Sequence, residues 1–458
     1  MNTTILNQLS TIVGAEHVSD TEADRALHSQ DQSTHSPVLP DVVVWPNSTA
    51  EVSAIAKIAS AHQIPVTAWG AGTSIEGHSI PIKRGISLNF QRMNRVLAVH
   101  TEDFQTTVQP GIFRKELEAH LATYGLMFAP DPGANASIGG MIANNAAGTR
   151  TVKYGATRDN VLALEVVLAS GEIIRTGSRS IKQSAGYDLT HLFTGSEGTL
   201  GLITAATLKL VPIPEHFSTA TIAFDSVEAA AEAVYGIIGS GLEPAALELI
   251  HKDMIGWMNE DAGAGLTVAP SLMVEFSGAS EQTVASAMKM AQEICAEVGS
   301  LGFQGGVGRD ARRTMWEFRH GIRERLVRTF PGEHWVLVDI AVPISNFPQL
   351  VAYCQQRIYD YGFDARIIGH AGDGNMHCGV HFAPDDMATQ ERAVELGKVM
   401  VAKALELEGT CTGEHGIGLG KQKYMVAEHG ETALDVMRTI KQALDPLNIL
   451  NPGKVLPA

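Results

Sequence analysis

Hydrophobic and polar positions in the first third of the chain follow first a helical and then a strand pattern. Ser48 and Glu51 have the S-x-x-E spacing of a capping box, and apolar residues recur at helical spacing from Val52 to Ala59. The apolar run from Ile64 to Trp69 then predicts a strand. Further along we expect strands near residues 86–89 and 106–109 and a helix over residues 113–124.

The stretch from Asp131 to Gly155 breaks this regularity. It is rich in Gly, Ala and Asn and has the period of neither a strand nor a helix, yet it is too apolar for a solvated linker. We expect a long ordered loop here, and such loops are usually functional. From Asn160 to Leu210 strands resume, and the sequence VPIPEH after them indicates a domain boundary near Pro214.

Beyond Pro214, helical and strand patterns alternate in a way that is typical of a separate α+β domain. The segment from Ala365 to Phe382 predicts two strands joined by a Gly-rich turn, and Gly409 closes the helix predicted after it. The other elements that we expect are strands at 271–276 and 336–342 and helices over residues 227–238, 281–298, 347–361 and 387–407.

Composition and charge narrow the class of protein. With 458 residues, 45% of them apolar and 18% charged, we expect two globular domains. The formal net charge of -16 argues against nucleic acid as the main partner, because phosphate binding depends on Lys and Arg. The four cysteines form no C-x-x-C pair, which indicates free thiols in a reducing, cytoplasmic compartment. No targeting signal and no run of about 20 apolar residues is visible, so any contact with a membrane, such as the inner membrane, would be peripheral.

The run GAGTSIEGHSIP, directly after Trp69, has the glycines that a phosphate-binding loop requires. Gly70, Gly72 and Gly77 allow tight turns and a close approach of backbone N–H groups to a ligand. The run lacks the G-K-[ST] of a Walker loop, and the HSIPIKRG that ends it cannot open a helix as a Rossmann fingerprint would. By itself it fits a plain loop equally well.

Two further glycine-rich stretches, PDPGANASIGGMIANNAAGTRTVKYG and GSEGTLGLIT, make this signal more specific. Together with the first run and the closing LDPLNILNPGKVLP, they resemble the FAD-linked D-2-hydroxyacid dehydrogenases of the vanillyl-alcohol-oxidase type flavoproteins, over nearly the whole chain. The D-lactate dehydrogenase (cytochrome) branch is most similar across Pro130 to Lys209, and glycolate oxidase catalytic subunits and D-2-hydroxyglutarate dehydrogenases are similar as well.

The resemblance implies an α+β fold, with a two-part FAD-binding domain of the vanillyl-alcohol-oxidase (PCMH) type and an inserted α+β substrate or cap domain. We expect the FAD-binding domain over residues 1–214, the cap domain with the metal site over residues 215–419, and a C-terminal segment over residues 420–458 that returns to the FAD domain. Thr73 stands where some relatives carry a histidine bonded to the flavin, so we expect non-covalent FAD, with His78 as an alternative tether. The residues carried over to cofactor binding are Gly70, Ala71, Gly72, Thr73, Ser74, Gly77, Pro130, Gly133, Ala134, Ser137, Gly139, Gly140, Asn144, Gly148, Thr149, Tyr154, Glu197, Gly198, Gly201, Ile203 and Asn451.

A second constellation could hold a metal ion. His370 and His377 lie at the facing ends of two predicted strands, where a tight turn would bring both imidazoles to one cation, and Glu414 would add a carboxylate. Three such ligands with open positions describe a catalytic site, and they suit Zn or Mn. Histidine pairs in turns are more often structural, so the interpretation depends on the dense glycines, the flanking strands and the resemblance. His381, on the same strand face as His377, is expected to pack or to support the ligands.

Proton transfer and substrate binding need further groups. His415 follows Glu414, and in the resembling enzymes the corresponding histidine removes the hydroxyl proton, although such a residue can also merely orient a carboxylate. A guanidinium can bind the carboxylate of a hydroxy acid through two N–H groups. By the family's W-x-x-R pattern we select Arg319, and Arg323 next, from the arginines of RDARRTMWEFRHGIRERLVR.

Taken together, the resemblance implies oxidation of a D-2-hydroxy acid, with D-lactate to pyruvate as the first choice and glycolate or D-2-hydroxyglutarate as the alternatives. D-2-hydroxyglutarate enzymes carry a lysine just before the strand that here reads HWVLVDIAVP. The apolar residues there favour a monocarboxylate, with His334 or Arg323 as the alternative partners for a distal carboxylate. Without a Rossmann fingerprint for NAD, we expect a cytochrome, a quinone or an electron-transfer flavoprotein as the acceptor. The sequence leaves a homodimer open.

Two rival functions remain at this stage. One is a metal-dependent hydrolase that uses His370, His377 and Glu414 with a metal-bound water, and colourless purified protein would support it. The other is a flavin-binding module without catalysis in an electron-transfer assembly. The adjacent Glu414 and His415 argue against the module, because a scaffold has no use for a base.

Overall fold

The computed structural model describes residues 1–457 and their side chains, except those of Phe318, His320, Arg323 and Glu324. Within it the chain forms two compact units. Apart from a short excursion, the chain enters the second unit at Pro214 and returns to the first at Glu414, whereas the sequence predicts a return near residue 420. The first unit comprises Met1–Ala147, Gly155–Ile213 and the chain from Glu414 onward, and the second comprises Gly148–Tyr154 and Pro214–Gly413.

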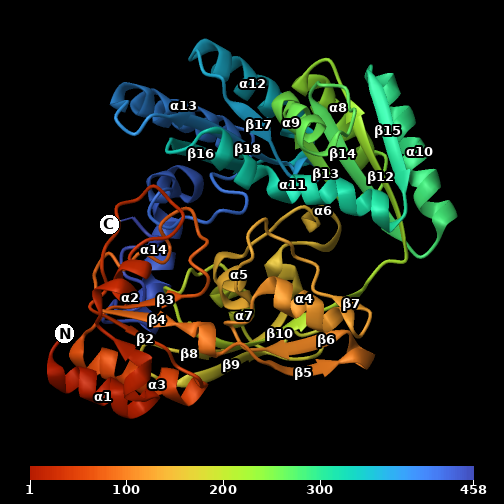
Figure 1. Ribbon diagram of the computed structural model, residues 1–458. Coiled ribbons are helices and arrows are strands. Elements are labelled where there is room, and N and C mark those ends of the chain that lie inside the picture. The colour runs from red at the N-terminus through yellow and green to blue at the C-terminus, as the bar shows by residue number, and fades with distance from the viewer. Residues whose placement is uncertain (458) are drawn as a thin grey trace. The chain divides into compact units, whose positions relative to one another are not determined.

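A mixed four-stranded sheet with helices packed on it opens the first unit (Figure 1); its elements are α1 (Thr3–Val13), α2 (Glu22–Leu27), α3 (Thr49–His62), β1 (Val18–Ser19), β2 (Val42–Val44), β3 (Val66–Trp69) and β4 (Ile86–Asn89). The strand order is β1-β2-β4-β3, with only β1 antiparallel to its neighbour. Leu9 of α1 and Ile55 of α3 are buried in the same core as Leu88 of β4. Ser48 caps α3 by accepting from the backbone N–H of Glu51, so the capping signal is confirmed.

An antiparallel five-stranded sheet and a short ribbon complete the strands of this unit: β5 (Val96–His100), β6 (Gln105–Val108), β7 (Leu126–Met127), β8 (Val161–Val167), β9 (Ile173–Gly177), β10 (Leu202–Lys209) and β11 (Val211–Pro212). The strand order of the sheet is β5-β6-β10-β8-β9, and β11 pairs with β7. Its core contains Leu121 of α4 (Arg114–Ala122), Met141 of α5 (Ile138–Asn144) and Phe193 of α7 (Leu189–Phe193).

The expectation of one long loop from Asp131 to Gly155 is wrong, because α5 and, in the second unit, α6 (Thr151–Tyr154) form within it. α5 begins after Ser137, whose hydroxyl accepts from the backbone N–H of Gly140. With seven residues, two of them glycine, α5 is too short to show a helical period. Its helical conformation depends on the burial of Ile138, Met141 and Ile142.

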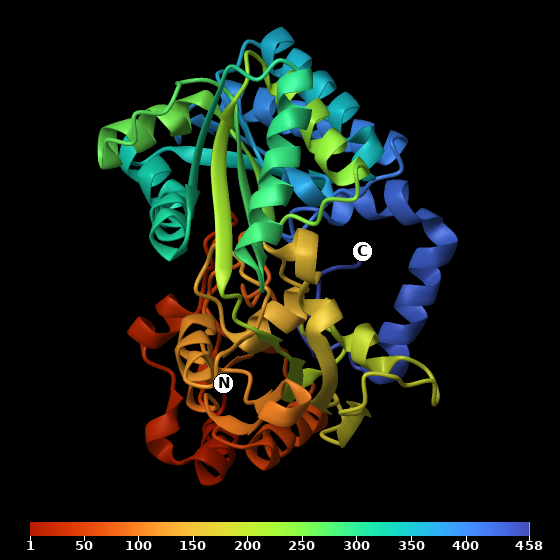
Figure 2. The same ribbon diagram turned by 90° about the vertical axis from the view of Figure 1, so that its right-hand side faces the viewer.

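The C-terminal segment packs into the hydrophobic core of the first sheet. The helix α14 (Met425–Leu444) bends at Gly430, which has non-helical φ and ψ angles of 73° and 160° (Figure 2). After it, Ile449 and Leu450 enter the core of the first sheet. The backbone N–H of Val66 donates to the carbonyl of Ile449 at 2.7 Å, which ties the last segment to β3.

The second unit contains two antiparallel sheets; their strands are β12 (His216–Ala223), β13 (Ala246–Ile250), β14 (Ser271–Gly278), β15 (Gly302–Val307), β16 (His334–Ala341), β17 (Arg366–Ile368) and β18 (Asn375–Phe382). The orders are β13-β14-β12-β15 and β16-β18-β17. An isolated bridge between Leu249 and Gly369 joins the two sheets. The α+β alternation predicted for this part of the chain is therefore present.

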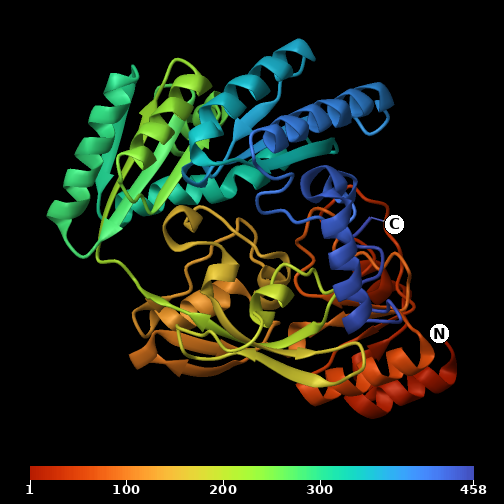
Figure 3. The ribbon, with the colours of Figure 1, turned by 180° about the vertical axis from the view of Figure 1, so that it is seen from behind.

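Helices cover the two sheets of this unit on opposite sides; they are α8 (Val227–Gly239), α9 (Lys252–Ala262), α10 (Glu281–Glu297), α11 (Arg309–Thr329), α12 (Phe347–Asp360) and α13 (Met387–Glu406). Figure 3 shows α10, α8, α12 and α13 along one side. On the other side, Trp257 of α9 and Trp316 of α11 share a core with Met273 of β14. Short 3-10 turns elsewhere in the chain are Ala15–His17, Phe90–Arg92, Thr101–Asp103, Thr157–Asn160, Ile344–Asn346, Ala371–Asp373 and Gln422–Tyr424.

Candidate functional site

Two imidazoles lie side by side in the second unit. His370 follows β17 and precedes the 3-10 turn Ala371–Asp373, and His377 is the third residue of β18. Ile368 of β17 pairs with His377 in antiparallel register, so the turn between the strands brings His377 back beside His370. The two ring centroids are 5.4 Å apart, with an interplanar angle of 90°.

Glycines make this turn possible. Gly374 has a φ of +78°, and a Cβ atom there would lie 2.1 Å from the carbonyl oxygen of Val342. A Cβ atom at Gly369 would lie 2.3 Å from the carbonyl oxygen of Asn375. Both positions therefore require glycine, because the backbone segments approach each other too closely for any side chain.

A completely buried carboxylate holds His370. The Nδ1 atom of His370 lies 2.7 Å from Oε1 of Glu248, whose exposed fraction is 0%. The second oxygen, Oε2, accepts from Nε of Arg319 at 2.8 Å and lies 2.6 Å from its Nη2. Burial by itself would raise the pKa of Glu248, but the charges and hydrogen bonds of His370 and Arg319 outweigh burial and lower the pKa below its ordinary value. Glu248 is thus an anion that orients both an imidazole and a guanidinium.

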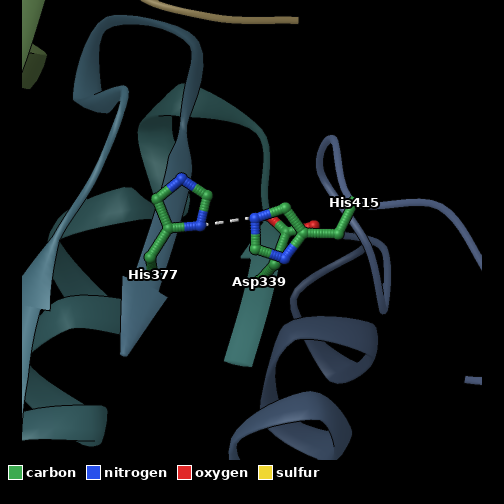
Figure 4. Close-up of side chains that lie close together, drawn as sticks. All are labelled: Asp339, His377 and His415. Carbon is green, nitrogen blue, oxygen red and sulfur yellow. Dashed lines mark ion pairs between the residues drawn. The ribbon is translucent and has the colours of Figure 1, made fainter. Parts of the chain in front are cut away.

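His377 also has a buried carboxylate beside it. Its Nδ1 atom lies 3.4 Å from Oδ1 of Asp339, which is 0% exposed and stands opposite His377 in the β16–β18 ladder (Figure 4). Asp339 accepts from Nδ2 of Asn375 at 2.8 Å and from the hydroxyl of Thr412 at 2.9 Å.

Sequence reasoning missed Glu248 and Asp339. Each is the single charged residue of an otherwise apolar strand, in ALELI and in the VLVDIA part of β16. A lone carboxylate in a buried strand is rare unless it is paired, and this is the signal that could have found both. The sequence does not say which cationic or hydrogen-bonding partner each one meets.

The expected substrate arginines lie on α11. Arg319 faces β13 and is held by the pairing described above. One turn earlier, the indole N–H of Trp316 donates to Glu275 of β14, and Nε of Arg312 lies 2.9 Å from the same carboxylate. The W-x-x-R pattern therefore lies on the face of α11 that meets the sheet. The side chain of Arg323 lies outside the described residues.

The segments expected to bind FAD meet in the first unit. The loop after β3 and the start of α5 are in contact, because a Cβ atom at Gly70 would lie 2.2 Å from the hydroxyl oxygen of Ser137. Asn451 Nδ2 donates to the carbonyl groups of His78 and Glu197 at 3.0 and 2.8 Å, which joins the last segment to the first and third. Of the expected cofactor residues, Gly148, Thr149 and Tyr154 belong instead to the second unit.

The loop after β3 fits a pyrophosphate. In the part of the chain that the structure describes, the backbone N–H groups of residues 71–74 donate to no other group of the protein. Gly72 and Gly77 have φ values of +66° and +80°, and the hydroxyl of Ser74 donates to Asp31 at 2.6 Å, which ties the loop to the segment after α2. Successive N–H groups in such a turn form a site for an anion, as the phosphates of FAD require.

A buried ion pair stands next to this loop. Nε2 of His78 lies 3.3 Å from Oε1 of Glu197, and both side chains are buried. Burial opposes both charges, yet the electrostatic attraction between the two groups prevails, so the pKa of His78 is raised and that of Glu197 is lowered. The histidine expected as an alternative flavin tether is therefore engaged by a carboxylate.

Glu414 and His415 are the first residues of the last segment of the first unit. The carbonyl oxygen of Glu414 accepts from Nδ2 of Asn144 at 2.8 Å, so the end of α5 fixes where this segment begins. The sequence had suggested Asn144 as a cofactor residue.

Other expectations concern side chains around the site. His381 stacks on Phe330 with a centroid distance of 3.9 Å and pairs with Glu333, so it packs as expected. All four cysteines are free thiols and buried, and burial raises the pKa of Cys378 to about 12. Within residues 1–457, no helix has the length and hydropathy needed to cross a bilayer.

Comparisons with known proteins agree with this arrangement. The chain matches the C-terminal domain of FAD linked oxidases over residues 213–455 and an FAD binding domain over residues 40–177. It is 40% identical to the "Probable D-lactate dehydrogenase, mitochondrial" of Danio rerio, over 99% of this chain and 91% of that protein. It is 39% identical to the "D-lactate dehydrogenase (cytochrome), mitochondrial" of Arabidopsis thaliana, over 99% and 80%. The structure of a 4-ethylphenol oxidase from Gulosibacter chungangensis shares the fold, with a TM-score of 0.80 at 20% identity over 99% of this chain and 97% of that one.

These similarities confirm the α+β fold of the vanillyl-alcohol-oxidase (PCMH) type and the FAD-binding domain that the glycine-rich stretches predicted. They favour neither of the two rival functions, the hydrolase and the flavin module without catalysis. This chain belongs to the FAD-linked oxidase family and is an FAD-dependent dehydrogenase.

Proposed function

We propose that this enzyme oxidises D-2-hydroxy acids to 2-oxo acids, with D-lactate as substrate and pyruvate as product, and that a divalent cation, Zn or Mn, binds at His370, His377 and Glu414. The similarity to two proteins named D-lactate dehydrogenase supports the substrate, and the word cytochrome in one name supports an electron carrier as acceptor. Bound FAD, held without a covalent bond, supplies the acceptor for the hydride from C2 of the substrate.

One observation carries the metal in this proposal: each imidazole has a fully buried carboxylate at its Nδ1 atom, Glu248 behind His370 and Asp339 behind His377. In metal sites a histidine commonly donates its Nδ1–H to a carboxylate while Nε2 binds the ion. His370 makes this hydrogen bond to Glu248 at 2.7 Å, and His377, whose ring centroid is 5.4 Å from that of His370, has Oδ1 of Asp339 at an ion-pair distance of 3.4 Å from its Nδ1. The chemistry of this donor set therefore fits a divalent cation.

Chain connectivity supports Glu414 as the third ligand and His415 as the base. The hydroxyl of Thr412 is anchored to Asp339 at 2.9 Å, and a Cβ atom at Gly413 would lie 2.1 Å from Nδ2 of Asn375. Successive Cα atoms are about 3.8 Å apart, and Glu414 and His415 are the next two residues after Gly413. They can therefore lie only a short distance from Gly413.

The chain's own groups would then act on the substrate as follows. His415 accepts the proton of the 2-hydroxyl group, a task suited to an imidazole because its pKa lies near neutrality. Arg319 is the candidate for binding the carboxylate: Glu248 engages its Nε and Nη2, so the substrate would use the remaining N–H groups of the guanidinium. Because Glu248 is buried and ionised, it keeps the guanidinium and His370 in one fixed arrangement.

The substrate is tested by anaerobic flavin reduction. The protein is reconstituted with FAD and mixed with D-lactate, L-lactate, glycolate or D-2-hydroxyglutarate, before and after treatment with EDTA. We expect D-lactate to bleach the flavin fastest, its L enantiomer not to bleach it, and EDTA to slow the reaction by more than about 100-fold, with recovery on addition of Zn or Mn. Faster reduction by glycolate or D-2-hydroxyglutarate would replace the substrate, and full activity after EDTA would remove the metal.

A variant pair separates the metal from the fold in the same assay. His370→Ala should lose turnover to the same extent as EDTA treatment and keep the flavin spectrum. His381→Ala is the matched control, because His381 lies on the same strand face but stacks on Phe330 and pairs with Glu333. It should retain the flavin spectrum and most of the activity.

A further inference from the structure

The segment that begins at Glu414 is held by its main chain. The backbone N–H groups of Ile417 and Gly418 donate to the two oxygens of Glu197, at 2.7 Å to Oε1 and 2.9 Å to Oε2. The carbonyl of Glu414 accepts from Nδ2 of Asn144. Two side chains of the first unit thus bind the backbone on both sides of His415.

Close packing around Gly416 restricts the segment to the observed backbone path. Gly416 has a φ of +79°, and a Cβ atom there would lie 2.3 Å from Oδ1 of Asn144, 2.6 Å from Nε2 of His78 and 2.9 Å from Oε1 of Glu197. Only glycine can pass between these three side chains. The segment therefore has little freedom to shift while they stay in place.

Glu197 is itself constrained. Its backbone has a φ of +54°, a left-handed conformation that residues other than glycine rarely adopt. Its carboxylate is buried, and His78 beside it favours the ionised form. An ionised carboxylate can accept from two N–H groups at once, which a neutral amide cannot do with both of its polar atoms. A strained, buried and charged residue is retained only where the surrounding structure requires it.

We propose that Glu197, together with His78 and Asn144, is a positioning residue for Glu414 and His415 and does not bind the cofactor through its side chain. Its carboxylate fixes the backbone of residues 414–418, and so determines where the third metal ligand and the base point. This inference rests on the proposed function for the roles of Glu414 and His415. The hydrogen bonding of Glu197 to this backbone is a separate property, and it can be measured without turnover.

The test uses Glu197→Gln in the FAD-reconstituted full chain. Gln has the same shape but keeps one acceptor, so one of the two backbone N–H groups loses its partner. Hydrogen–deuterium exchange of peptides covering residues 414–421 should become about 10-fold faster or more. The kcat for D-lactate should fall by about 10- to 100-fold while its KM and the Kd of FAD change by less than about threefold, because a misplaced group slows the chemical step without weakening binding.

Two further variants complete the design. Asn144→Ala removes the hydrogen bond to the Glu414 carbonyl and the packing beside Gly416, and it leaves both bonds of Glu197 in place. It should give a smaller change in the same direction, so it carries the test if Glu197→Gln does not fold. Ser79→Ala is the control, because Ser79 is buried in the same loop as His78 and has no bond to residues 414–418. It should leave exchange at 414–421 unchanged.

Unchanged exchange at residues 414–421 in Glu197→Gln would overturn the inference, as would a Kd of FAD that weakens in step with kcat, since Glu197 would then be a cofactor ligand. A wild-type enzyme that oxidises no D-2-hydroxy acid would overturn the proposed function instead. The exchange measurement would still decide whether Glu197 holds the segment.

Discussion

Single buried carboxylates determine the chemistry that the histidines of the second unit can perform. An imidazole has two nitrogen atoms, and the group at Nδ1 decides which of them can act as a ligand. Glu248 takes this position for His370, and it also binds Arg319 through its other oxygen. A change at Glu248 should therefore affect the proposed metal binding more than the fold.

We predict that Glu248→Gln weakens the binding of Zn or Mn by about 10- to 100-fold, because an uncharged amide no longer supports the imidazole. Competition with a chelating dye would measure the affinity. Glu275→Gln is the matched control: Glu275 is also buried on the neighbouring strand, but it pairs with Arg312 and Trp316 and not with His370. Equal affinities in the two variants would contradict a role of Glu248 behind the ligand.

At the scale of elements, the short helix α5 connects the glycine-rich segments. Its cap, Ser137, contacts Gly70 of the first loop, and its last residue, Asn144, binds the segment that carries His415. Seven residues do not form a stable helix in isolation, so α5 exists only through its cap and its buried side chains. A change at this cap should therefore affect both the stability of α5 and the packing of α5 against the first glycine-rich loop.

We predict that Ser137→Ala lowers the free energy of unfolding by about 1 kcal/mol, the usual cost of losing a cap, and also weakens FAD binding. Ser48→Ala removes the corresponding cap of α3, which has no part in the glycine-rich loops. It should cost a similar free energy and leave the Kd of FAD unchanged. Urea unfolding would measure the free energy of unfolding, and flavin fluorescence titration would measure the Kd of FAD. If both variants weakened FAD binding equally, the effect of Ser137→Ala would be only a general loss of stability.

At the scale of the whole molecule, the chain closes its first unit with its last residues. Lys454 is 3% exposed, and its ammonium group donates to the carbonyls of His78 and Ile80 at 3.1 and 2.6 Å. Burial lowers the pKa of Lys454 to about 8, against the opposing attraction of Glu197 and Asp31. Lys454 therefore holds the backbone of the segment that follows Gly77 in the first glycine-rich run.

This burial predicts a pH dependence of stability. Between about pH 8 and about pH 10.5 the unfolded chain holds the Lys454 proton and the folded chain does not, so the free energy of unfolding rises with pH in this window and falls as pH is lowered through 8. Subtracting the values for Lys454→Met isolates this contribution. We expect the difference, wild type minus variant, to grow by up to about 3 kcal/mol across the window in urea titrations. A difference that stays constant would show that Lys454 titrates as it does in the unfolded chain.

The sequence by itself determined what depends on neighbouring residues. The cap and apolar spacing at Ser48 predicted α3, the strand at residues 86–89 is β4, and the helix expected over residues 347–361 is α12. Glycine-rich runs indicated the cofactor loops, and the Gly-rich turn indicated that His370 and His377 would meet. These features are local, because periodicity, capping and turn chemistry act over a few residues.

Only the tertiary structure decided which distant groups meet. Glu248 is 122 positions from His370, and Glu197 is 220 positions from Ile417. The bridge between Leu249 and Gly369 brings β13 against the turn that carries His370, and no local pattern encodes that pairing. For the same reason α5 was not predicted, since its helical state depends on burial among strands far away in the sequence. Strand order and burial are properties of the folded chain as a whole, and they turn two isolated acidic residues into the partners of the histidines.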